Sequence, residues 1–349
     1  MMLPDGTLCT PFTPLIGFPR LAAEIGVSTL LLKMESVHPF SHTFKDRGAL
    51  AVVREAKNRN AASVLAASCG NMGTAVAGAC AKYGIPALIL LSREAPVVTK
   101  KMIAAFATRT WLCDGRFDEL DAVVTRLTLQ HPQVACVNTT LNEAFRTGFR
   151  SLMAELLAQL EPNGRYAVCI PTADGTLMAA CYDEYLSFRR KIGARDGPRV
   201  RFVLAQPSGC APLVRAHSTG TSLVSWAESE TMVLPLSVRH PTPHGLAALQ
   251  CLIETEGTAV AIPEGDIQGY ACRLARLGGI FSDLVGGVML GAISEIARQG
   301  WLRAGETPVG IYTGNGLIAP DSVHDFELPT EIGDKEAEEQ IDRYLLKSN

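Results

Sequence analysis

Short apolar runs alternate along this chain with longer amphipathic or alanine-rich stretches. An unbroken apolar run of this kind is typical of a strand buried on both faces, and the stretches between the runs have the spacing of helices. The predicted strands cover residues 63–67, 87–91, 110–113, 134–137, 166–171, 201–205 and 309–312. The predicted helices cover residues 73–83, 97–107, 117–130, 145–160, 177–191, 245–254, 266–277 and 288–298.

Strands that alternate with helices predict parallel sheets with helices on their faces, which is the α/β fold class. The chain has 349 residues, whereas a single hydrophobic core stops growing at about 250–300 residues. The sequence therefore predicts two α/β lobes. No internal repeat or low-complexity stretch interrupts the pattern, and the acidic segment after Pro329 is predicted to form a terminal helix.

The composition excludes several classes of partner. Hydrophobic residues make up 47% of the chain, charged residues make up 19%, and the net charge is −3, so there is no basic field to attract nucleic acid or anionic lipid. The ten cysteines form no Cys-x-x-Cys pair, which argues against a zinc site or a short disulfide framework. No apolar run reaches the roughly 18–20 residues of a membrane-spanning helix, and no signal-peptide pattern opens the chain. We therefore expect a cytoplasmic protein that binds a small molecule, without nucleic acid, membrane or metal.

The first candidate for chemistry is Lys45. It lies in the run Ser41-His42-Thr43-Phe44-Lys45-Asp46-Arg47-Gly48, between a turn and a predicted helix start. A lysine with a desolvated amine loses its proton readily and can carry an aldehyde cofactor as an imine. A Lys-Asp-Arg triplet taken alone is more often part of a solvated helix surface. The triplet by itself leaves both interpretations open.

Three loops that follow predicted strands are further candidates, because ligands in open α/β sheets bind beyond the carboxyl ends of the strands. They cover residues 68–73, 171–176 and 313–317. The first two contain glycine and open a helix, so their main-chain amides could bind an anion, although each could also be only a turn and a helix cap. Asp174 would repel a phosphate, so it must either turn outward as an N-cap or mark a changed site. In the third loop the hydroxyl of Thr313 could form a hydrogen bond with the nitrogen of a heterocyclic ligand.

Taken in order, several segments resemble one known family. They are Leu32-Lys33-Met34-Glu35, Pro39, Thr43-Phe44-Lys45-Asp46-Arg47-Gly48, Ser68-Cys69-Gly70-Asn71 and Thr313-Gly314-Asn315-Gly316-Leu317. The pattern is similar to that of the pyridoxal-phosphate enzymes of the tryptophan-synthase-β fold (fold type II), and within that fold to threonine synthase. The resemblance implies two open, twisted α/β lobes with the cofactor in the cleft between them. The smaller, substrate-side lobe would comprise residues 44–150. The larger, cofactor-binding lobe would comprise residues 1–43 and 151–330, followed by an acidic C-terminal tail, 331–349.

The resemblance also implies roles for the matching residues. Lys45 would hold pyridoxal 5′-phosphate as an imine and then act as a general base. Asn71 would donate a hydrogen bond to the phenolic oxygen of the ring. Thr313 would face the ring nitrogen, where a neutral hydroxyl favours elimination or replacement over aminotransfer. Backbone amides at a helix N-terminus would bind the cofactor phosphate, and these belong to Ala173, Asp174, Gly175, Thr176 and Leu177. The substrate-binding candidates are Thr43, Ser68, Asn138 and Arg146, with Lys33 and Ser41 as further candidates for anion binding.

The implied activity is conversion of O-phospho-L-homoserine and water to L-threonine and phosphate, by a lyase expected to be a homodimer. Four features depart from the family pattern. Met72 stands where a threonine usually follows the asparagine, Asp174 lies in the phosphate loop, Gly278 replaces a glutamate, and residues 138–148 do not align cleanly. They leave open β-replacement or β-elimination on phosphoserine or a related activated amino acid, as in a cysteate- or diaminopropionate-synthase-like enzyme. A threonine or serine dehydratase and a non-catalytic sensing or scaffold protein are further alternatives.

Overall fold

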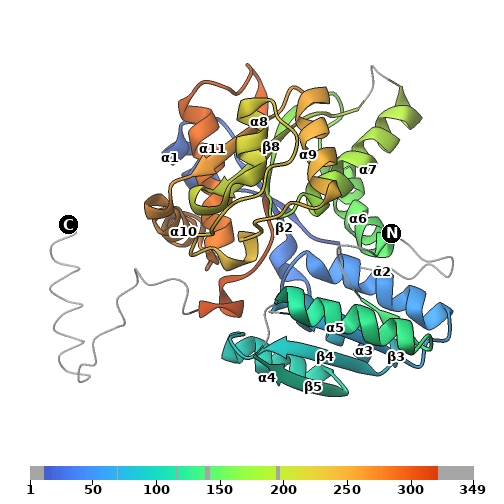
Figure 1. The fold of residues 1–349 in the computed structure, drawn as a ribbon. Coiled ribbons are helices and arrows are strands. Elements are labelled where there is room, and N and C mark those ends of the chain that lie inside the picture. The colour runs from blue at the N-terminus through green and yellow to red at the C-terminus, as the bar shows by residue number, and fades with distance from the viewer. Residues whose placement is uncertain (1–11, 69, 115–116, 138–141, 194–196, 321–349) are drawn as a thin grey trace, which may run out of the picture.

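The strands of this chain form two separate sheets (Figure 1). The computed structural model describes residues 12–68, 70–114, 117–137, 142–193 and 197–320. The larger sheet has the order β1-β2-β10-β7-β8-β9, and the smaller sheet has the order β5-β4-β3-β6. Neighbouring strands are parallel except for the antiparallel pair β1 and β2. The strands are β1 (Leu15–Gly17), β2 (Leu31–Met34), β3 (Ser63–Ser68), β4 (Ala87–Ser92), β5 (Arg109–Cys113), β6 (Val134–Cys136), β7 (Arg165–Pro171), β8 (Arg199–Pro207), β9 (Thr258–Ile262) and β10 (Glu306–Tyr312).

Helices pack against both sheets. None of the described helices is long and apolar enough to cross a membrane. The helices are α1 (Pro19–Ile25), α2 (Lys45–Asn58), α3 (Asn71–Tyr83), α4 (Val97–Phe106), α5 (Phe117–Gln130), α6 (Glu143–Gln159), α7 (Thr176–Ile192), α8 (Pro212–Thr219), α9 (Pro243–Glu254), α10 (Glu264–Gly278) and α11 (Leu284–Arg298). Short 3-10 helices include η1 (Glu35–Val37) and η4 (Gly316–Ile318).

The predicted α/β class with parallel sheets is confirmed. Each strand and helix predicted within residues 12–320 is present, with ends that shift by a few residues. The helix predicted after Pro329 lies outside the described residues.

Apart from the short 3-10 helices, the elements α1, α8, β1, β2 and β9 were not predicted, and only the start of α2 was. The two helices begin with proline and end at a glycine in the left-handed conformation, with φ of 75° at Gly26 and 64° at Gly220. Proline at the start and glycine after the end are the expected boundary signals of a helix. These signals were in the sequence, but both helices are too short for the apolar periodicity to stand out. The missed strands are short, and β2 is interrupted by a lysine.

Alternate residues of the central strands of the larger sheet belong to two different hydrophobic cores. Val168 and Ile170 of β7 lie in the core that also contains residues of α2, α3 and α6. Ala167 and Cys169 lie in the core formed with α10 and α11. Successive side chains of a strand point to opposite faces of the sheet, so both faces of this sheet are buried in hydrophobic cores. The first of these cores also includes Val64 of β3 and is therefore continuous between the two sheets.

Helices α2 and α6 cross with glycine against glycine, between the two sheets (Figure 1). A Cβ on Gly48 would lie 2.3 Å from Cδ1 of Phe145, and a Cβ on Gly148 would lie 2.5 Å from the carbonyl oxygen of Arg47. Both separations are well below van der Waals contact, so only glycine fits without a shift of the helices. The crossing holds the first turn of α2, which begins at Lys45, against α6.

We expect Gly48→Ala to lower the free energy of unfolding by about 1–3 kcal/mol, because the added methyl group overpacks the α2–α6 crossing. The measurement is the urea midpoint of unfolding. Gly269→Ala is a matched control, since Gly269 lies within α10 and a Cβ there meets nothing within 4 Å. That change should stabilise the protein by roughly 0.5–1 kcal/mol through helix propensity. Equal midpoints for wild type and Gly48→Ala would contradict the tight crossing.

Candidate active site

Lys45 and Thr313 lie in neighbouring segments although they are far apart in the sequence. The loop that follows β2 runs back along the end of β10. The amide of Phe44 donates a hydrogen bond to the carbonyl oxygen of Thr313 at 3.1 Å, and Thr43 forms an antiparallel bridge with Gly314. These contacts are made by the main chain and position the loop independently of its side chains. The structure therefore joins the first and the last of the predicted site segments.

The turn before α2 is closed by hydrogen bonds of its own side chains. The carboxylate of Asp46 accepts hydrogen bonds from the amides of Phe40 at 2.8 Å and Ser41 at 3.0 Å. The hydroxyl of Thr43 accepts a hydrogen bond from the amide of Lys45 at 3.2 Å and is also hydrogen-bonded to the Ser41 hydroxyl. Burial raises the pKa of Asp46, and the hydrogen bonds from Ser41 and Phe40 oppose that shift. Thr43 and Ser41, predicted to bind substrate or anion, thus shape the turn that presents Lys45.

A buried ionic cluster, formed by Lys33, Glu35, Arg47 and Glu155, lies on the other side of this turn. Arg47 pairs with Glu35 at 2.6 Å and with Glu155 at 2.9 Å, and Lys33 pairs with Glu155 at 2.7 Å. Burial acts to raise the pKa of Glu35, but Arg47 outweighs it and holds that pKa well below its usual range. The amine of Lys33, a further candidate for anion binding, is therefore already engaged in a buried ion pair. The cluster ties β2, η1, α2 and α6 together.

The surroundings of Lys45 favour the neutral form of its amine. Burial lowers the pKa of Lys45, and the nearby carboxylate of Asp174 opposes this shift. The Nζ atom also lies 4.6 Å from the centroid of the Phe44 ring. A lowered pKa increases the fraction of neutral amine, which is the nucleophilic form. Lys45 is partly buried and Asp46 and Arg47 are fully buried, so the interpretation of the triplet as a solvated helix surface is wrong.

The second predicted loop connects β7 to α7 and packs on the start of α9. Gly175 has φ of 99°, and a Cβ there would lie 2.7 Å from the Cα of Gly245. Only glycine meets both demands. The side-chain Nε2 of Gln206 donates a hydrogen bond to the carbonyl oxygen of Ala173 at 3.2 Å, and the side chain of Leu177 is buried in the core. Leu177 can therefore contribute only its backbone to a ligand, as predicted for this loop.

Asp174 directly precedes Gly175, the N-cap residue of α7, and its carboxylate is hydrogen-bonded to the first residue of that helix. One carboxylate oxygen accepts a hydrogen bond from the amide of Thr176 at 3.0 Å, and the other accepts one from the Thr176 hydroxyl at 2.7 Å. Asp174 is therefore not the N-cap residue itself, and the alternative of a changed site stays open. The amide and hydroxyl of Thr176 are donors that an anion at this helix N-terminus would use.

The first predicted loop opens α3 at Asn71. The hydroxyl of Ser68 accepts hydrogen bonds from the amides of Gly70 at 2.9 Å and Gly73 at 2.8 Å. Ser68, predicted to bind substrate, is thereby engaged with the start of α3. Asn71 is partly buried and is the first residue of that helix, so it lies beyond the carboxyl end of β3; its hydrogen bond to the cofactor ring stays a prediction.

Of the two remaining substrate candidates, only Arg146 lies within the described residues. Asn138 lies outside the described residues. Arg146 of α6 pairs with Asp183 of α7 and lies 3.6 Å from Glu143. Its guanidinium is therefore engaged in an ion pair between two helices. Binding of a substrate anion by Arg146 stays a prediction, and it would compete with Asp183.

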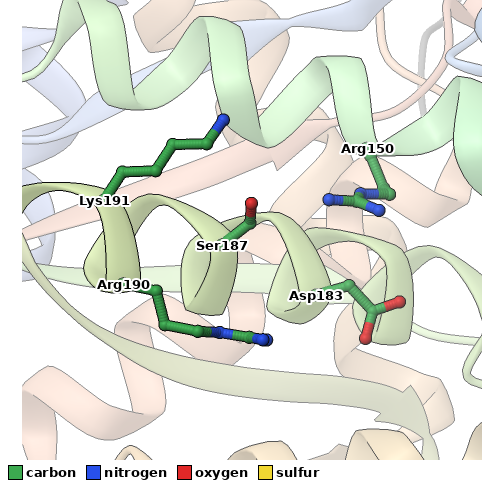
Figure 2. Close-up of a pocket in the computed structure, with 5 residues that line it drawn as sticks. All are labelled: Arg150, Asp183, Ser187, Arg190 and Lys191. Carbon is green, nitrogen blue, oxygen red and sulfur yellow. The ribbon is translucent and has the colours of Figure 1, made fainter.

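The surface near Arg146 has a pocket of about 480 Å³ between α6 and α7. Figure 2 shows its lining residues, Arg150, Asp183, Ser187, Arg190 and Lys191. Arg150 is paired with Glu184 at 2.8 Å. None of the predicted cofactor residues lines this pocket, so it is separate from the site around Lys45.

Asp283 is a site residue that the sequence analysis missed. It caps α11 by accepting a hydrogen bond from the amide of Gly286 at 3.1 Å. Its other oxygen faces the Thr43–Gly314 bridge, because a Cβ on Gly314 would lie 3.2 Å from it. Burial raises the pKa of Asp283 to about 6, against hydrogen bonds from amides of α11. An aspartate before an apolar helix signals a cap, but its contact with the last loop is long-range and leaves no local signal.

These features fit the cofactor that the family resemblance implies. Lys45 offers an amine, and Thr313 offers a hydroxyl at the end of β10. The start of α7 offers main-chain donors. The loop before it approaches α9 so closely that a Cβ at Gly175 would collide with that helix. Only Asp174 does not fit a bound phosphate in its present hydrogen bonds. Among the described residues, no group of three or more histidine, cysteine, aspartate or glutamate side chains is arranged to hold a metal ion.

Comparisons with known sequences agree with this geometry. The profile of one family, described as "Pyridoxal-phosphate dependent enzyme", matches residues 7–314. Threonine synthase from Methanosarcina acetivorans is 28% identical over 324 residues, which cover 92% of this chain and 78% of that protein. Threonine synthase from Bacillus sp. (strain ULM1) is 25% identical over 320 residues, which cover 91% of this chain and 86% of that protein.

Solved structures have the same fold at lower sequence identity. Maize serine racemase superposes with a TM-score of 0.74 at 17% identity, covering 97% of this chain and 94% of that one. The processed form of threonine deaminase isoform 2 from Solanum lycopersicum superposes with a TM-score of 0.73 at 20% identity, covering 88% and 80%. The two-lobed architecture expected from the resemblance is therefore that of fold type II.

Asp283→Asn should stabilise the protein at neutral pH and leave its stability nearly unchanged in acid. The pKa of Asp283 in the fold is about 6 against an ordinary value of 3.8. The stabilising contribution of the protonated form is therefore complete below about pH 4 and is lost as the pH rises through about 6. The difference between these two pKa values corresponds to roughly 3 kcal/mol. Asparagine keeps the acceptor for the Gly286 amide and removes the charge.

This is measured by urea unfolding between about pH 4 and pH 8. Asp266→Asn is the control, since Asp266 is an exposed aspartate in the first turn of α10. A difference between Asp283→Asn and wild type that stays constant over the whole pH range would contradict the raised pKa.

Proposed function

The chain belongs to the family of pyridoxal-phosphate-dependent enzymes, and from this premise we propose that it is a lyase that converts O-phospho-L-homoserine and water to L-threonine and phosphate. The observation that carries the proposal is the main-chain junction of the Lys45 turn with Thr313, in a chain similar to threonine synthases along about nine-tenths of its length. We also expect a homodimer in the cytoplasm, on the basis of the resemblance.

Pyridoxal phosphate, when bound, supplies an electron sink for a carbanion next to the amino group of the substrate. The residues of the chain would then do the rest. The amine of Lys45, with its pKa lowered by burial, would hold the cofactor and afterwards move protons at the substrate carbons. Thr313 would present a neutral hydroxyl to the ring nitrogen. A neutral partner does not force that nitrogen to be protonated, and this supports elimination and replacement over aminotransfer.

Binding of a phosphorylated substrate needs donors that are separate from the cofactor phosphate loop. The candidates remain Thr43, Ser68, Asn138 and Arg146. The hydroxyls of Thr43 and Ser68 lie at the starts of α2 and α3, where main-chain amides add positive potential. We propose that the leaving phosphate is held between these two helix starts.

A second candidate is β-replacement or β-elimination on phosphoserine or a related activated amino acid. One observation favours it: Arg146, the cation expected at the leaving phosphate of the longer substrate, is paired with Asp183. A shorter substrate would place its leaving group closer to Lys45 and would not require Arg146.

The two candidates differ in the substrate from which phosphate is released. Purified enzyme loaded with pyridoxal phosphate should release phosphate from O-phospho-L-homoserine and form threonine in equal amounts, which chromatography measures. O-phospho-L-serine, tested in parallel, should release little. Phosphate release from O-phospho-L-serine alone would replace the first candidate by the second.

Lys45→Ala should abolish the visible absorbance band of the lysine-linked cofactor and lower the rate at least about a hundredfold, because it removes both the point of attachment and the general base. Lys57→Ala is the matched control on the same helix, since Lys57 is exposed in the last turn of α2. A wild-type protein that stays colourless with added cofactor, or a Lys45→Ala variant that keeps the band, would contradict the assigned role.

A further inference from the structure

The first turn of α7 already holds an anion that belongs to the chain itself. Both oxygens of Asp174 are engaged, one by the amide and the other by the hydroxyl of Thr176. The positive end of a helix dipole stabilises a carboxylate in this place just as it stabilises a phosphate. The amine of Lys45 is also close enough for the two charges to attract each other.

The geometry leaves little freedom for the loop to move away from this arrangement. Gly175 packs directly on Gly245 of α9, and the carbonyl oxygens of Ala173 and Asp174 accept hydrogen bonds from Gln206 and Thr242. The backbone of the loop is therefore fixed, and the side chain of Asp174 is the part that can turn.

We propose that the carboxylate of Asp174 competes with the phosphate of the cofactor for the amide and hydroxyl of Thr176, and so sets how tightly that phosphate is held. A phosphate carries about two negative charges near neutral pH. It cannot share these donors with a carboxylate at hydrogen-bonding distance without repulsion. Asp174 must turn out when the cofactor enters, and the cost of breaking its two hydrogen bonds reduces the affinity. This inference rests on cofactor binding and does not depend on which amino acid is the substrate.

Asp174 has two separable effects on the cofactor, and two ligands distinguish them. Through its charge, it opposes the lowering of the pKa of Lys45, which affects any aldehyde that reacts with that amine. Through its hydrogen bonds, it occupies donors that only a phosphorylated ligand needs. Pyridoxal has the aldehyde but lacks the phosphate, so it reports the first effect alone.

The experiment compares wild type, Asp174→Asn and Asp174→Gly, each freed of cofactor and titrated with pyridoxal phosphate and with pyridoxal. The visible absorbance of the bound ligand gives the dissociation constants. An asparagine side chain keeps an acceptor for the Thr176 amide, so Asp174→Asn should retain this hydrogen bond at the start of α7. Pyridoxal phosphate should bind both variants at least about tenfold more tightly than wild type, the change expected for about one charge-assisted hydrogen bond. Pyridoxal should gain much less.

Glu184→Gln is the matched control, because it removes the same charge from α7 at a position about two turns further along. It should leave both dissociation constants unchanged. Equal gains for the two ligands would overturn the proposal and assign the effect to Lys45. Unchanged or weaker binding of pyridoxal phosphate by both variants would overturn it as well. If the variants bind pyridoxal phosphate more tightly but the enzyme releases no phosphate from O-phospho-L-homoserine, this inference is supported and the proposed function is contradicted.

Discussion

The guanidinium of Arg47 is completely enclosed by protein, and it is bound by carboxylates from two other parts of the chain. Glu35 follows β2 directly, and Glu155 lies near the end of α6. Burying a charge costs several kcal/mol unless its partners are in place, so β2, α2 and α6 must come together as a unit. Lys45 opens the same helix two residues before Arg47. The position of the Lys45 amine therefore depends on this buried ionic cluster.

The same cluster explains why the site could be predicted from short sequence segments. Lys33, Glu35 and Arg47 belong to the segments that carried the family resemblance, and they are neighbours in the structure. The strands and helices around them were predictable because apolar runs and helical spacing are local signals. By contrast, β2 was missed because Lys33 interrupts its apolar run. A buried lysine is compatible with a central strand only when a distant partner, here Glu155, supplies the opposite charge.

The departures from the family pattern have different physical origins. Gly278 ends α10 where a Cβ would lie 3.0 Å from the side chain of Leu21 in α1, so the close approach of these two helices limits the size of that residue. Met72 packs against the core beneath α3. Both are matters of packing, which a single sequence does not reveal. Asp174 differs from them, because its effect is electrostatic and its carboxylate lies at the predicted phosphate loop.

Two carboxylates of the site experience opposite conditions, and this constrains its chemistry. Asp174 lies at a helix start and near Lys45, and its carboxylate opposes the lowering of the pKa of that lysine. Asp283 is enclosed behind the Thr43–Gly314 bridge, and burial favours its neutral form there. A phosphate that displaced the carboxylate of Asp174 would replace its negative charge near Lys45. A negative charge on Asp283 would have no comparable cation beside it. At the start of α7 the negative charge next to the amine therefore comes either from Asp174 or from the phosphate that would displace it.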